Sequence, residues 1–267
     1  MMTLKKRTKL PNISHLMDST ESTFFIENTT QEFWALAEGL PDLPRDMQTA
    51  ISLALPLEIY PVPDLRVSHV LAWAQRVNIT HYIGGRNRRL HGCLLADRGK
   101  GTIFFDASDT PPEQRFTLAH ELSHFLLDYQ FPRRRAVGIL GVSILVVLDG
   151  ERPATREERL HAVLSGVPLG VMSHAMERPD DGLPANFIIA IEDRADRLAL
   201  ELLAPAQALY TMMQQAAPQG YAARLTFLTR LLTQEYGLPE IMASSYARYL
   251  LAQLGEPTFR DWLFDHA

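Results

Sequence analysis

The chain has 267 residues, enough to bury a sizeable core, and its 46% hydrophobic and 21% charged residues are typical of a globular protein. Its formal net charge of -5 excludes a generally basic, nucleic-acid-binding surface. The single cysteine, Cys93, excludes an intramolecular disulfide and any zinc site built from cysteines, and it favours a reducing compartment. Cys93 falls in a strand-like run, so we interpret it as a buried structural thiol.

No targeting or membrane segment is predicted. The first residues are basic, but residues 12–22 are polar and lack the apolar stretch of a secretory signal. The most apolar run, residues 136–148, is shorter than the ~20 residues of a spanning helix. We expect a buried element there, with contact to a partner or a membrane surface as the alternative. The expected location is the cytoplasm.

The N-terminal part of the chain is predicted to be helical. Residues 1–25 are expected to be loosely ordered, and residues 30–55 to form short helices broken at Gly39 and at two prolines. Apolar side chains at helical spacing predict a further helix over residues 65–77.

Three short strand-like runs follow, at residues 79–83, 90–95 and 102–105. The segment that joins the last two, residues 97–101, contains two glycines, which supply the positive φ angles of a tight hairpin turn. The sequence therefore predicts a small antiparallel sheet.

A strong helix start follows the predicted sheet. Thr110 and Glu113 fit a capping box, and Pro111 occupies a position whose N–H would have no partner in the helix. The helix is expected to end at about Asp128, before Pro132. Its side chains are apolar nearly all round, which predicts a central, buried helix.

The remaining elements are predicted to be mostly helical. A helix is expected at residues 155–164 within the less readable region 129–190, and a second clear helix at residues 191–203. Two or three more helices are expected to fill the C-terminus, and the clearest of them cover residues 225–236 and 239–254. The expected fold class is α+β, mostly helical with a small sheet.

The central helix carries the chemistry, in the segment from His120 to His124. Residues four apart lie on one face of a helix, so these two histidines can bind one tetrahedral zinc ion, with Glu121 beside them as the general base. Two histidines and a glutamate in an otherwise apolar helix are costly to bury unless a partner such as zinc satisfies them.

The helix predicted at residues 191–203 offers the third ligand. Glu192 and Asp196 are four apart, and this spacing suits a glutamate ligand and an aspartate that holds the outer N–H of a histidine. The alternative is that both pair with neighbouring arginines at the surface. His161 and His174 are the other candidates, since three-histidine zinc sites exist, but each stands alone in the sequence. We therefore predict Glu192 as the third ligand.

These two segments resemble a known family. Residues 115–127 are similar to the active-site helix of the ImmA/IrrE family of zinc metallopeptidases, and residues 192–205 resemble its third-ligand helix. The resemblance covers about residues 60–250, and the first motif is specific when it is joined to the second.

The resemblance implies a zincin-like fold and a set of roles. His120, His124 and Glu192 would bind zinc, Glu121 would be the general base, and Asp196 would take a supporting position. Family members cleave a helix-turn-helix transcriptional repressor and so switch on stress-response or mobile-element genes. The implied partner is therefore a protein substrate such as a DNA-binding repressor, without direct contact to nucleic acid or membrane.

The stretch between the two motifs is longer than this family usually shows, which predicts an inserted subdomain near the cleft. The predicted division is an N-terminal helical extension (1–59), a metallopeptidase domain (60–210, with the insertion at 129–190) and a C-terminal helical region (211–267).

Two other functions stay open. One is a regulatory protein that binds a DNA-binding partner and uses zinc only structurally. Glu121 argues against it, because a structural zinc site has four protein ligands and needs no adjacent carboxylate. The other is direct DNA binding through residues 225–254, whose turn at Gly237 resembles that of a helix-turn-helix. Arg248 is the one cation able to read bases in the second of these helices, which disfavours that interpretation.

The sequence also suggests how a substrate would bind. A peptide can pair as an extended strand with an exposed sheet edge beside the cleft. We expect that edge to be formed by residues 102–105.

Overall fold

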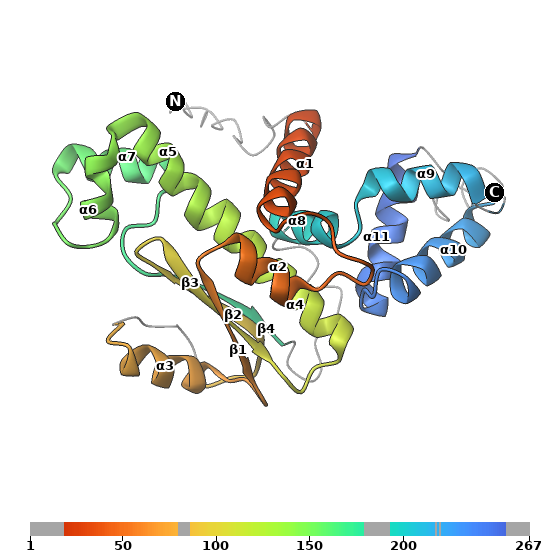
Figure 1. Ribbon diagram of the computed structural model, residues 1–267, viewed down its shortest axis with the longest axis horizontal. Coiled ribbons are helices and arrows are strands. Elements are labelled where there is room, and N and C mark those ends of the chain that lie inside the picture. The colour runs from red at the N-terminus through yellow and green to blue at the C-terminus, as the bar shows by residue number, and fades with distance from the viewer. Residues whose placement is uncertain (1–18, 80–85, 179–192, 217, 219, 255–267) are drawn as a thin grey trace, which may run out of the picture.

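The computed structural model describes residues 19–79, 86–178, 193–216, 218 and 220–254. Helices surround a small four-stranded sheet (Figure 1), so the fold is α+β, as predicted. No helix in these segments is both long and apolar enough to cross a membrane.

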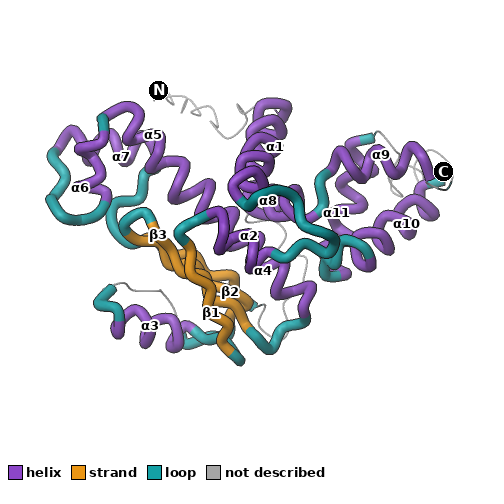
Figure 2. The backbone as a smooth tube through the Cα atoms, viewed as in Figure 1, coloured by secondary structure: helices purple, strands orange, loops and turns teal. Residues whose placement is uncertain are grey.

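The sheet is mixed, not antiparallel as predicted. It consists of β1 (Leu57–Val62), β2 (Leu90–Asp97), β3 (Lys100–Asp106) and β4 (Met172–Glu177), in the order β1-β3-β2-β4. The strands are orange in Figure 2. The β2–β3 hairpin is antiparallel, which confirms that prediction, and β4 is antiparallel to β2, but β1 is parallel to β3. We did not predict β1 as a strand because it contains Pro61, which has no backbone N–H to donate. An outer strand tolerates a proline because the backbone groups on its outer side have no neighbouring strand to pair with.

The predicted docking edge at residues 102–105 is wrong. This run lies in β3, which has β1 on one side and β2 on the other, so both of its sides are occupied. The strand β1, which was not predicted, pairs with the side of β3 that was expected to be exposed. Among the described strands, the outer ones are β1 and β4.

Both faces of the sheet are covered, which explains why β2 reads as a continuous apolar run. Cys93 and Leu95 pack beneath the helix α3 (Val67–Arg76), which matches the helix predicted at residues 65–77. Leu94 and Ala96 face the opposite way, into the main core. Cys93 is fully buried, as expected of a structural thiol.

The N-terminal helices are longer than predicted. The helix α1 (Ser19–Leu36) begins inside the run expected to be loosely ordered, and α2 (Met47–Ala54) follows it. Phe33 and Trp34 of α1 are buried in the main core. Packing of this kind stabilises a helix whose local signals are weak. Residues 1–18 lie outside the described part of the chain.

The central helix starts as predicted but does not stop before Pro132. The helix α4 (Pro111–His124) begins with the expected capping box between Thr110 and Glu113. It continues through a π-helical segment, Phe125–Gln130, into α5 (Phe131–Leu140). A proline inside an α-helix clashes with the carbonyl one turn back, and the wider π turn just before it relieves that conflict.

The region that we predicted to be an insertion forms a small helical unit with its own core. After α5, the chain passes through a 3₁₀ turn (Val142–Ile144), α6 (Leu145–Leu148) and the predicted helix, α7 (Arg156–Ser165). The apolar run at residues 136–148 is partly buried here, as expected. Five buried side chains make up the core of this unit: Ala136, Ile144, Val147, Leu148 and Val167.

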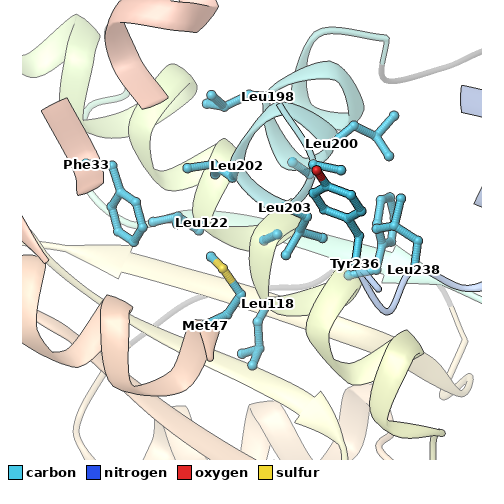
Figure 3. Close-up of a cluster of buried hydrophobic side chains, with 14 of the residues drawn as sticks. Phe33, Met47, Leu118, Leu122, Leu198, Leu200, Leu202, Leu203, Tyr236 and Leu238 are labelled. Atoms are coloured by element: carbon cyan, nitrogen blue, oxygen red, sulfur yellow. The ribbon is translucent and has the colours of Figure 1, made fainter. Parts of the chain in front are cut away.

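The described C-terminal helices are α8 (Asp193–Leu203), α9 (Ala206–Ala216), α10 (Tyr221–Gln234) and α11 (Glu240–Gln253). α8, α10 and α11 overlap the predicted ranges, α10 begins four residues earlier than predicted, and no range was predicted for α9. Side chains of α1, α2, α4, α8 and the turn after α10 meet in one core around Leu122, Leu198 and Leu202 (Figure 3). This shared core fixes α4 between the sheet and α8. The strand predicted at residues 79–83 falls, apart from Ile79, outside the described residues, and the domain division stays a prediction.

Candidate metal centre

The buried end of α4 brings together the three residues of the predicted motif. His120, Glu121 and His124 are all buried between the sheet and α8. The two histidines lie one helical turn apart, and their Nε2 atoms are separated by 3.3 Å. Two ligands at ~2.0–2.1 Å from a tetrahedral zinc ion would lie roughly 3.3 Å apart, so this pair fits such an ion.

Each histidine is held at its other ring nitrogen by a carboxylate. His120 Nδ1 lies 2.8 Å from Asp196 Oδ1 on α8, and His124 Nδ1 lies 2.7 Å from Asp128 Oδ2 in the π-helical segment. Because a carboxylate only accepts, each Nδ1 donates to its aspartate, and the Nε2 atom of each ring is turned toward the other histidine. A carboxylate on the outer nitrogen of each histidine is the arrangement that orients metal-binding histidines, so the pair could hold a metal ion through Nε2.

Asp128 was not identified from the sequence, although it lies four residues after His124 on the same helix. Its other oxygen, Oδ1, accepts from Arg194 of α8 at 2.6 Å. The i, i+4 spacing was the available signal. This spacing predicts a contact only within a helix, and the predicted helix ended at about Asp128.

Glu121 is an inward-facing carboxylate with two unlike oxygens. Its side chain has no exposed surface. Oε2 lies 2.9 Å from His174 Nδ1, whereas Oε1 is buried and has no hydrogen-bond partner within the described part of the chain. Burial acts to raise the pKa of Glu121, and the charge and hydrogen bond of His174 with the charges of His120 and His124 act to lower it. The net direction is downward. The ionised carboxylate is the form able to accept a proton.

A glycine in the sheet lets Glu121 sit this deep. A Cβ added to Gly92 of β2 would lie 2.4 Å from Thr117 Cγ2 and 3.1 Å from Glu121 Oε1. The backbone of β2 and the inner face of α4 are therefore in contact at this point, which only glycine allows.

His174 joins the site although no local pattern around it indicated that position. It lies on β4 opposite Leu94, on the side of the sheet that faces α4. One ring nitrogen of each of His120, His124 and His174 lies within 4.8 Å of the others. The contact depends on the pairing of β4 with β2, which no local pattern reveals.

The other predicted site residues have different outcomes. Asp196 contacts a histidine at its outer nitrogen, the contact that the motif predicted. Glu192 lies outside the described residues, one residue before α8 begins. His161 lies on α7 at the small core of the inserted region and is not part of the histidine cluster.

Two buried histidines on one helix, with a buried glutamate between them, are typical of a metal-dependent hydrolase. The comparison with protein families agrees: residues 83–137 match a peptidase family model described as the IrrE N-terminal-like domain. This segment is therefore similar to the IrrE N-terminal-like domain, which confirms the resemblance to the ImmA/IrrE family. The match includes β2, β3 and α4 and ends before α8. No curated protein and no solved structure matches the chain.

Proposed function

We propose that this protein is a zinc-dependent endopeptidase with a zincin-like active site, which cleaves a protein substrate. The observation that carries the proposal is the geometry of α4. The Nε2 atoms of His120 and His124 converge, and the buried Oε1 of Glu121 has no partner among the described residues. The peptidase family match supports the same activity.

His120, His124 and Glu192 would hold the metal. Glu192 is favoured because it precedes Asp196 by four residues in the sequence, and Asp196 contacts His120 from α8. Bound zinc would polarise the scissile carbonyl and lower the pKa of water to about 7. Glu121 accepts the proton of the attacking water and then delivers it to the leaving amine.

The first prediction concerns Glu121. Glu121→Gln is nearly isosteric and leaves the histidines untouched, so it should keep one zinc per chain but lose at least about 100-fold in cleavage rate, as general-base catalysis contributes ~10²–10⁴-fold. The cleavage rate is measured by incubating each protein with a proteome-derived peptide library and counting the new N-termini over time by mass spectrometry. Equal cleavage by wild type and variant would refute the role of Glu121. Intact zinc without any cleavage by the wild type would favour a regulatory protein with a structural metal.

We also propose that the substrate pairs with β4. This strand is an outer strand among those described, and it carries His174 on the side that faces the site. A peptide along the outer side of β4 would therefore run beside Glu121, and main-chain pairing would orient the scissile bond. Family resemblance suggests a DNA-binding repressor as the substrate, and the single cysteine suggests a cytoplasmic location.

The second prediction tests this docking edge. A saturating amount of a cleavable peptide, added to zinc-loaded Glu121→Gln, should slow backbone hydrogen exchange in β4 by about tenfold or more. The other outer strand, β1, is the internal control and should not change. Protection of β1 with none in β4 would show that the substrate uses the opposite edge.

A further inference from the structure

We infer that His174 is a positioning residue for Glu121, which holds Oε2 and thereby leaves Oε1 as the oxygen that accepts the proton. This inference rests on the proposed peptidase function. It gives a specific role to the region inserted between the two motifs, because His174 reaches the site on β4 after that region has folded back onto the sheet.

His174 is close enough to the other histidines to suggest a third ligand, but its orientation disfavours that role. Its ring stacks on the His124 ring, with a centroid distance of 3.6 Å and an interplanar angle of 18°. A ring nitrogen binds a metal through a lone pair in the ring plane. In two nearly parallel, stacked rings these lone pairs run side by side and do not converge on one ion. His174 therefore lies against the ligand His124 without sharing its metal.

A contact of His174 that bears on catalysis is directed at Glu121. Its Nδ1 lies 2.9 Å from Oε2, where the N–H donates to the carboxylate. An ionised carboxylate with no exposed surface needs such a donor, since burial without one is strongly unfavourable. This hydrogen bond also makes the two carboxylate oxygens unequal, because Oε2 accepts from His174 whereas Oε1 has no hydrogen bond from any described residue.

The strand that carries His174 is fixed along its length. β4 pairs with β2 from Ala96↔Met172 to Leu90↔Glu177. At the end of the strand, Arg88 forms an ion pair with Glu177. One residue further on, Arg178 donates to Asp106 at 2.8 Å. These contacts hold the backbone of β4 against the sheet, and a positioning role for His174 requires such a fixed support.

The third prediction uses three variants of zinc-loaded protein. His174→Ala removes the donor, and His174→Asn keeps an N–H close to the position of Nδ1. His161→Ala is the matched control, a histidine of the same inserted region outside the cluster. All three should retain one zinc per chain, whereas Glu192→Ala should not. His174→Ala should lower kcat about 100-fold with little change in KM, as small misplacements of catalytic groups do. His174→Asn should recover most of this loss.

A second measurement does not depend on catalysis. In ¹⁵N-histidine-labelled, zinc-loaded protein, the Nδ1–H of His174 should give a downfield proton resonance that is lost in His174→Ala and in Glu121→Ala but kept in His161→Ala. Persistence of that resonance in Glu121→Ala, or loss of zinc from His174→Ala, would overturn the inference. So would an unchanged kcat in His174→Ala. If the wild type cleaves nothing, the proposed function fails, while zinc content and the resonance still decide the position of His174.

Discussion

The two histidines of the candidate metal centre are supported by different kinds of structure. His120 is held across a helix–helix interface by Asp196 of α8, whose side chain is 20% exposed. His124 is held from within its own continuous helix by Asp128, whose side chain is 41% exposed and also contacts Arg194. The first support exists only when α8 is docked, whereas the second follows from local helical spacing.

This difference predicts unequal contributions to the site. A charge-assisted hydrogen bond is stronger where water is excluded, so the Asp196 contact should hold its histidine more firmly than the Asp128 contact. Solvent can replace a half-exposed carboxylate at little cost, and the Arg194 contact uses the other oxygen of Asp128, not the one that holds His124. Metal binding should therefore depend more on the packing of α8 than on the π-helical segment.

The largest effect should come from a change that displaces both histidines and Glu121 together. Gly92→Ala places a methyl group 2.4 Å from Thr117 Cγ2, so α4 must move away from the sheet and carry both histidines and Glu121 with it. We expect a loss of about 1–3 kcal/mol in unfolding free energy, as for other overpacked cores. Cleavage should fall about 100-fold or more. Denaturant unfolding and peptide cleavage measure the two effects.

Two further variants control for this change. Gly138→Ala on α5 adds the same methyl group where nothing lies within 4 Å, so it should not destabilise the protein. Gly92→Ala combined with Thr117→Ser removes the clashing Cγ2 and should restore most of the stability. A double variant no more stable than Gly92→Ala would show that the close contact with Thr117 is not the cause.

A smaller effect should separate the two supports. Asp196→Ala should weaken zinc binding by about 10–100-fold, the range for loss of a carboxylate that holds a metal-binding histidine. Asp128→Ala should weaken it by about tenfold or less, because water can take its place. Competition with a chromophoric chelator gives both affinities under identical conditions. If Asp128→Ala weakened zinc binding more than Asp196→Ala, the difference in burial between the two aspartates would not explain how strongly each supports its histidine.

The same distinction between local and non-local contacts explains what could be predicted from the sequence. His120, Glu121 and His124 were recognisable because their spacing on one helix defines their relation to each other. The aspartate of α8 was recognisable because its helix carries a second motif. His174 was not, since its place depends on the register of β4 against β2, with Leu94 as its partner.

The sheet shows the same limit. The β2–β3 hairpin was predicted because its turn is local, and the capping box at Thr110 marked the start of α4 for the same reason. The parallel pairing of β1 with β3 joins segments that are distant in sequence, and Pro61 concealed the strand. Because β1 was not predicted, the internal strand β3 was expected to be an exposed edge where a substrate could dock.

The pairing of β4 with β2 also has a consequence for the order in which the protein matures during synthesis. Glu121 and His174 are separated by 53 residues, and His120 and Asp196 by 76. A nascent chain that has left the ribosome only as far as α5 already contains both histidines and the glutamate on one helix. It still lacks the donor to Glu121 and the support for His120, because long-range contacts form only after the intervening chain has closed its loop. The growing polypeptide therefore carries an incomplete site until α8 has been made and docked.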